Sequence, residues 1–177
     1  PSGWEAPGQR KWTSRMRAFA DSVENDAYGS AWARLNGTGG EDKCVMLESH
    51  VDEIGFIVNH IEETGFLSMS PIGGSDCTLA AARRITLFGS KGEVTGIFGN
   101  TAIHLRDTDK DKIPEWKDLF VDVGASSAAE AAALGIRVGT PAVYADLPQE
   151  LPGGRIVGRA LDNRISGYML TRVFAEL

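Results

Sequence analysis

The sequence predicts an α/β domain that is interrupted by an all-β insertion. Apolar residues recur at helical spacing near both ends of the chain, whereas the middle carries short runs of Val, Ile, Phe and Thr separated by turn residues. The first pattern is typical of helices that pack on a sheet, and the second of a small barrel or sandwich. We therefore expect residues 1–53 and 147–177 to form the α/β part and residues 54–146 to form the insertion.

Length, charge and cysteine content limit the class of protein. The chain has 177 residues, 42% of them hydrophobic, which suits one ordinary domain or a domain with a small insertion. Its net charge of −6 argues against a general binder of nucleic acids or membrane surfaces. No apolar run is long enough to span a bilayer, and a signal-peptide core is not evident. Cys44 and Cys77 make no disulfide framework, so we expect a cytoplasmic protein.

Periodicity predicts the elements of the first part. Residues 28–35 fit a strand, and the apolar run 44–47 predicts a buried strand with Cys44 as a buried thiol. Residues 9–23 predict an amphipathic helix. The apolar stripe of this helix consists of Trp12, Met16, Phe19, Ala20 and Val23.

Turn residues divide the insertion into short elements. The predicted strands are residues 54–61, 66–70, 84–88, 93–98 and 119–123. Residues 62–65 and 90–92 predict hairpin turns. The charged run 107–117 is expected to be a solvated loop or a helical turn. Residues 126–130 fit a capping box before a short helix that ends at Leu134.

The last part is predicted to contain a short strand over residues 155–157 and then a helix that opens at Asp162. Helical spacing places five apolar side chains on one stripe of this helix, which we expect to be buried. The stripe consists of Ile165, Tyr168, Met169, Val173 and Leu177.

His50 and Asp52 are the residues that point most directly to chemistry. They follow the apolar run 44–47, and side chains two residues apart in a strand point to the same face. Imidazole and carboxylate groups at the end of a buried strand suit zinc and related metals. The alternative is a buried, hydrogen-bonded pair that orders a loop.

A metal would need a further group, for which Asp162 is the local candidate. It follows a short strand and opens a helix, so we expect its carboxylate at the same sheet edge as His50. The alternative is an N-cap that accepts backbone N–H bonds. His60, in an alternating strand, and His104, in a loop, are weaker candidates. Ser49 lacks a nucleophile-elbow context, which disfavours a serine hydrolase.

A series of short motifs runs in order along almost the entire chain. The motifs are residues 50–56 (His-Val-Asp-Glu-Ile-Gly-Phe), 65–67, 71–74, 96–99 with His104, 118–124, 139–141 and 160–164 (Ala-Leu-Asp-Asn-Arg). Together they resemble the dinuclear-metal aminopeptidases of the deblocking or glutamyl type, which include the tetrahedral self-compartmentalising peptidases. Each motif is weak by itself, and the ordered set is specific.

The resemblance implies a peptidase domain with a central mixed sheet, split by a β-barrel-like dimerisation domain. It implies that His50 binds one metal, that Asp162 bridges two metals, and that Asp52 is a catalytic carboxylate that orients His50 and raises its basicity. It further implies two divalent ions, zinc or cobalt, that activate a water for cleavage of the N-terminal residue of peptides. Homo-oligomers are expected, tetrahedral dodecamers in the family, with no nucleic-acid or membrane partner.

The chain corresponds to only about the first half of a member of this family. The glutamates that supply the general base and a ligand, and the later Asp and His ligands, are expected after Leu177. We therefore expect an aminopeptidase as the parent protein, an inactive chain by itself, and uncovered apolar surfaces on the helix after Asp162. The competing hypothesis is a non-catalytic oligomerisation or binding module with a vestigial metal site. A glycosidase is disfavoured because no paired carboxylates occur at a recognisable spacing.

Overall fold

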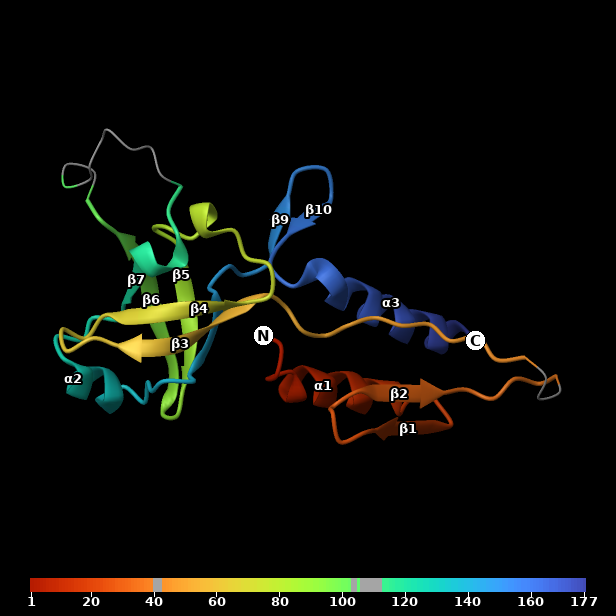
Figure 1. Ribbon diagram of the computed structural model, residues 1–177. Helices are drawn as coiled ribbons and strands as arrows, with labels where there is room; N and C mark the ends of the chain where they lie inside the picture. Colours follow the sequence, from red (N-terminus) through yellow and green to blue (C-terminus); the bar gives the residue numbers. More distant parts are fainter. Residues whose placement is uncertain (40–42, 103–104, 106–112) are drawn as a thin grey trace. The chain divides into compact units, whose positions relative to one another are not determined.

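The computed structural model describes residues 1–39, 43–102, 105 and 113–177 (Figure 1). The chain forms two compact units. The barrel unit consists of residues 1–2 and 54–159, and the terminal unit consists of residues 3–53 and 160–177. Helices and a closed antiparallel barrel occur together, which confirms the predicted fold class of an α/β chain with a barrel-like insertion.

Six strands of the barrel unit form a closed ring. They are β3 (Gly55–Ile61), β4 (Leu67–Ile72), β5 (Arg84–Gly89), β6 (Gly92–Asn100), β7 (Leu119–Asp122) and β8 (Pro141–Tyr144). The order around the ring is β3-β4-β7-β6-β5-β8, and β8 pairs again with β3. All of these pairs are antiparallel. Closure gives every strand two partners, so the ring has no open edge.

Aromatic side chains fill the inside of the barrel. Phe56 is fully buried, and its ring lies 5.0 Å from the rings of Phe98 and Tyr144 and 5.4 Å from that of Trp116. The contacts with Phe98 and Tyr144 are edge-on, the arrangement that aromatic pairs favour. Apolar residues that alternate along the strands complete the core, among them Val58, Leu67, Ile85, Leu87 and Val121.

Short helical segments connect the strands of the barrel. They are η1 (Cys77–Leu79), η3 (Trp116–Asp118) and α2 (Ala128–Ala133). The predicted capping box is confirmed in part. Ser127 is the N-cap, and its Oγ accepts the Glu130 N–H at 3.2 Å, whereas Glu130 Oε2 accepts the N–H of Ser126, one residue before the N-cap, at 2.7 Å. The turn between β3 and β4 ends at Gly65, whose φ of +89° favours glycine.

Sequence patterns located most of the barrel strands but missed β8. Its four residues are all buried, so it shows no alternation of apolar and polar side chains. Strand β9 (Gln149–Leu151) was missed as well, and β10 (Arg155–Val157) was predicted. These two strands form a separate antiparallel hairpin. Most of the charged run 107–117, together with His104, lies outside the described residues.

The terminal unit contains α1 (Ala6–Met16), β1 (Ser22–Asn25), β2 (Ala31–Arg34) and α3 (Leu161–Glu176). The prediction of one helix over residues 9–23 is wrong beyond Met16. Val23 lies in β1 instead, paired with Ala33 of β2. The turn between these strands is fixed by Asp26, whose Oδ1 accepts the N–H groups of Tyr28 and Ser30. This turn brings β1 beside β2, so the backbone of β1 forms hydrogen bonds with β2 instead of continuing the helix.

The predicted buried strand at residues 44–47 is also wrong. These residues have no regular secondary structure, and Cys44, Val45 (83% exposed) and Met46 (81%) face solvent. A strand needs ladder partners, and none of the described strands pairs with this segment. Helix α3 forms as predicted, but the stripe from Ile165 to Leu177 is exposed rather than buried. That exposure agrees with the expected uncovered face. Over the described residues no helix has the length and apolar character that crossing a bilayer requires.

Candidate metal centre

His50 lies between two carboxylates of the terminal unit. Its Nδ1 is 2.9 Å from Asp52 Oδ1, and its Nε2 is 3.1 Å from Asp162 Oδ1. The three residues that the sequence singled out are therefore brought together, although Asp162 follows His50 by 112 positions. The His50 and Asp162 side chains are largely exposed, so the group is open to solvent.

The backbone presents Asp162 to the imidazole. The second and third residues of α3 are not helical: Asp162 has φ −89° and ψ 104°, and Asn163 has φ −126° and ψ 31°. The peptide bond between them is cis. The N-cap position belongs to Ala160, so the N-cap alternative for Asp162 is wrong. The Asp162 side chain is 95% exposed, and its Oδ1 lies 3.1 Å from His50 Nε2.

An ion pair that sequence reasoning did not identify lies next to this group. The Arg164 Nε–H donates to the Val51 carbonyl oxygen at 2.8 Å, and Arg164 Nη2 lies 3.0 Å from Glu53 Oε1. Glu53 is buried, with 8% of its surface exposed. Glu53 and Arg164 fall within the motifs at 50–56 and 160–164, and this membership could have drawn attention to them. Their spacing in the sequence does not predict that they form a pair.

The donor atoms around His50 are suited to a cation. A neutral imidazole donates from one ring nitrogen only. If Nδ1–H donates to Asp52, then the Nε2 lone pair faces the Asp162 carboxylate at 3.1 Å, and two acceptors oppose each other. A proton or a metal ion between them removes this repulsion. Two ligand atoms bound to one tetrahedral zinc ion lie about 3.3 Å apart, which is close to the separation between Nε2 and the Asp162 carboxylate oxygen.

The donor set in the described residues is incomplete. No group of three or more His, Cys, Asp and Glu side chains with a geometry suited to a metal is found within residues 1–39, 43–102, 105 and 113–177. His60 lies on the barrel, where its Nε2 is 3.7 Å from Glu62 Oε1, and takes no part in the group around His50. The residues present thus fit a metal as two of its ligands, His50 and Asp162, with Asp52 supporting the imidazole.

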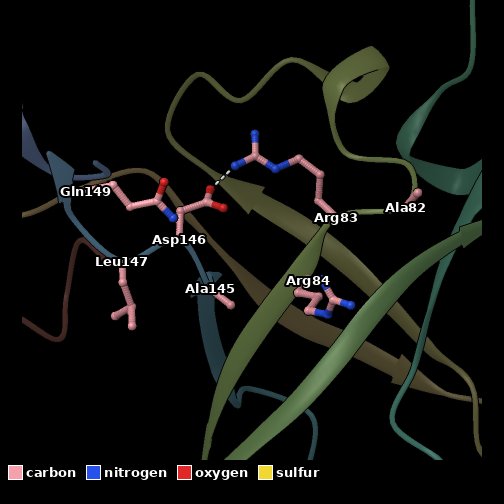
Figure 2. A pocket seen from close by; sticks show the side chains of 7 residues that line it. All are labelled: Ala82, Arg83, Arg84, Ala145, Asp146, Leu147 and Gln149. Atoms are coloured by element: carbon pink, nitrogen blue, oxygen red, sulfur yellow. Dashed lines mark hydrogen bonds and ion pairs between the residues drawn. The ribbon is translucent and has the colours of Figure 1, made fainter. Parts of the chain in front are cut away.

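Among its described residues, the barrel unit offers no comparable group of side chains. Figure 2 shows a hollow beside β5 and β8 in which Arg83 points toward Asp146 and forms an ion pair with it. The Arg83 guanidinium also lies 4.3 Å from the centre of the Tyr144 ring. The acidic side chain of this hollow is therefore already engaged by a cation, and the hollow is not a candidate catalytic site.

Cys77 is a potential nucleophile in the barrel unit, but its surroundings suppress it. Burial raises the pKa of the Cys77 thiol, and the negative charges of Asp118, Asp76 and Glu115 raise it further. Because the thiolate is the reactive form, a raised pKa makes the side chain less nucleophilic near neutral pH. This cysteine therefore has a structural rather than a catalytic environment.

Comparison with known proteins agrees with the fold. Residues 29–177 match the family model of the M42 glutamyl aminopeptidases. The chain belongs to this family, which confirms the resemblance drawn from the motifs.

Individual relatives give the same result. The lysyl aminopeptidase of Pyrococcus furiosus is 37% identical over 180 residues, covering 99% of this chain and 51% of that protein. An aminopeptidase structure from Desulfurococcus kamchatkensis has a TM-score of 0.92 and 34% identity, covering 100% of this chain and 48% of that one. The Pyrococcus horikoshii TET1 peptidase has a TM-score of 0.86 and 29% identity, covering 99% and 52%. The chain thus spans about half the length of these relatives.

Proposed function

We propose that the parent protein is a metal-dependent aminopeptidase that removes N-terminal residues from peptides. The observation that carries this proposal is the position of the His50 ring, between Asp52 at 2.9 Å and Asp162 at 3.1 Å. Membership of the M42 family and the names of the relatives support it. Two divalent ions, zinc or cobalt, are the proposed cofactors.

Each of the three residues has a separate proposed role. His50 would hold one metal ion through Nε2, and Asp162 would hold the same ion together with a second one. Asp52 accepts the Nδ1–H, which fixes the tautomer of His50 and strengthens Nε2 as a ligand. When bound, such metals polarise the scissile carbonyl and activate a water.

The remaining ligands and the general base are proposed to lie in the part of the relatives that this chain does not span. This chain by itself is therefore expected to be inactive. Residues 1–53 and 147–177 are assigned to the peptidase domain and residues 54–146 to the inserted dimerisation domain. The exposed segment 45–47 and the exposed stripe of α3 are then surfaces that the rest of the peptidase domain covers.

Self-association through the barrel is part of the same proposal. The P. horikoshii TET1 peptidase assembles into a tetrahedron or a large octahedral shell. We propose a homo-oligomer for the parent protein, a cytoplasmic location, and no nucleic-acid or membrane partner; the net charge of −6 is consistent with the last point.

The decisive experiment is metal removal and restoration on the full-length parent protein. Chelation should abolish cleavage of aminoacyl substrates, and zinc or cobalt should restore it. Asp162→Ala should lower turnover by at least about 100-fold and reduce the metal content, because one carboxylate supports two ions. His60→Ala is the matched control and should change neither, since His60 lies on the barrel. Activity that persisted after thorough chelation would refute the metal-dependent function.

The non-catalytic module is a second candidate because the barrel ring is closed, whereas the described part of the chain holds an incomplete set of metal ligands. Full-length protein that assembles and binds metal, yet cleaves no peptide from a library of free N-termini, would favour the module.

A further inference from the structure

Arg164 joins the two stretches of chain that carry the candidate metal centre. Its Nε–H donates to the carbonyl oxygen of Val51, the residue between His50 and Asp52. Its Nη2 meets the Glu53 carboxylate at 3.0 Å. Arg164 itself follows Asp162 by two positions. A single side chain therefore links the segment between His50 and Asp52 to the helix residue two positions after Asp162.

The ion pair depends on both partners. The Glu53 side chain is only 6% exposed, and a buried carboxylate is costly unless a cation and hydrogen bonds compensate it. The guanidinium reaches the carbonyl and the carboxylate at once because its donors form a rigid, planar fork. A lysine carries the same charge but lacks this fork.

Regular structure does not fix the separation between His50 and Asp162. Residues 43–54 belong to no helix or strand, so no ladder fixes the backbone around His50. Asp162 and Asn163 have non-helical dihedral angles, so α3 departs from regular helix geometry at Asp162, although the Arg164 N–H donates to the Ala160 carbonyl oxygen at 3.2 Å. The bonds of Arg164 to Val51 and Glu53 are long-range contacts that span this gap.

We propose that Arg164 and Glu53 are positioning residues that hold His50 Nε2 and Asp162 Oδ1 at the separation a shared metal needs. This inference rests on the proposed metal centre and names residues that act on it without touching the metal. Loss of groups that orient ligands lowers metal affinity by about 10- to 100-fold, and that is the loss expected for Arg164→Met.

The test uses the histidine ring signals of the chain in long-range ¹H–¹⁵N NMR spectra. The chain has three histidines, so its imidazole signals are few and His60 serves as an internal reference on the barrel. In the metal-free chain, Arg164→Met and Glu53→Gln should each shift the His50 ring signals and leave those of His60 unchanged. Arg172→Met is the matched control. It removes an exposed Arg–Glu pair on the same helix, 3.3 Å long, and should shift neither ring.

Titration with Co²⁺ supplies the second measurement. Paramagnetic shifts of the His50 ring should saturate in the wild-type chain and require about 10- to 100-fold more Co²⁺ in Arg164→Met. Arg164→Lys should fall between the two, because it keeps the charge and loses the bond to Val51. This conservative variant decides the question if Arg164→Met fails to fold, as judged by the His60 signals and circular dichroism.

The two proposals fail in different ways. If wild-type His50 does not respond to Co²⁺, the metal centre is refuted in this chain, while the metal-free spectra still decide whether Arg164 positions His50. If the His50 signals of Arg164→Met and Arg164→Lys match those of the wild type with and without Co²⁺, the positioning role is overturned.

Discussion

The two units of the chain are held together in different ways. The barrel unit has a closed ladder around a core of buried apolar side chains, with Phe56 among three other aromatic rings. In the described residues of the terminal unit, Met16 is the one fully buried hydrophobic side chain. The group around His50 there is fixed instead by polar contacts. Apolar packing thus stabilises one unit, and directional bonds between distant residues shape the other.

The largest expected effect tests the apolar side of this comparison. Phe56→Ala should lower the free energy of unfolding of the barrel unit by about 3–5 kcal/mol, because it removes a buried ring and leaves a cavity. Met46→Ala in the exposed segment should change stability by no more than about 0.5 kcal/mol. Native-state hydrogen exchange reports each unit separately. Equal effects of the two substitutions would show that the barrel core is not the main source of stability.

A smaller effect is expected at two glycines that have a similar positive φ but different surroundings. Gly65 in the barrel unit and Gly29 in the terminal unit have φ of +89° and +92°. A Cβ on Gly65 would lie 2.3 Å from the Ala125 carbonyl oxygen, whereas a Cβ on Gly29 would meet nothing within 4 Å. Gly29→Ala should therefore lower the free energy of unfolding only by the cost of a left-handed alanine, about 1–2 kcal/mol. Gly65→Ala should cost about 1–3 kcal/mol more.

Thermal denaturation of the two glycine variants provides the measurement, with hydrogen exchange used to assign each transition to its unit. Similar losses for Gly65→Ala and Gly29→Ala would mean that the turn between β3 and β4 relaxes away from Ala125. In that case the barrel would be less tightly constrained at its turns than its closed ladder suggests.

The smallest expected effect concerns reactivity and leaves stability unchanged. Cys44 in the terminal unit is exposed, whereas burial and three nearby carboxylates raise the pKa of Cys77 in the barrel. Iodoacetamide reacts with the thiolate, so Cys77 should be alkylated more slowly near pH 8. Its rate should keep rising as the pH increases through its raised pKa. Peptide mass spectrometry separates the two sites, and equal rates at pH 8 would contradict the difference in environment.

Sequence patterns predicted the barrel better than the terminal unit. Alternating or continuous apolar runs located β3, β5 and β6, because their burial is decided within the unit. The same reasoning failed for residues 44–47, where an apolar run found no strand to pair with and stayed exposed. Strand β8 was missed because Pro141 opens it and all four of its residues are buried.

The grouping of the three candidate residues was predictable from the sequence, and the contacts that support this grouping were not. His50 and Asp52 stand two residues apart, and Asp162 follows a predicted strand, so residue type and position singled out all three as candidates, while their separate roles came from the family resemblance. The pairing of Glu53 with Arg164 joins residues 111 positions apart. Charged residues are usually solvated, and only the fold shows that this carboxylate is buried.

The circular order of the barrel strands has a consequence for cutting the unit into fragments that reassemble. When a ladder returns to its starting strand, cutting one connecting turn breaks the chain without leaving any strand short of a neighbour. A nick between β5 and β6 should accordingly give two fragments that stay associated and that reassemble when made separately. The barrel unit should therefore keep its fold when its chain is cut, which suits it to split-reporter designs.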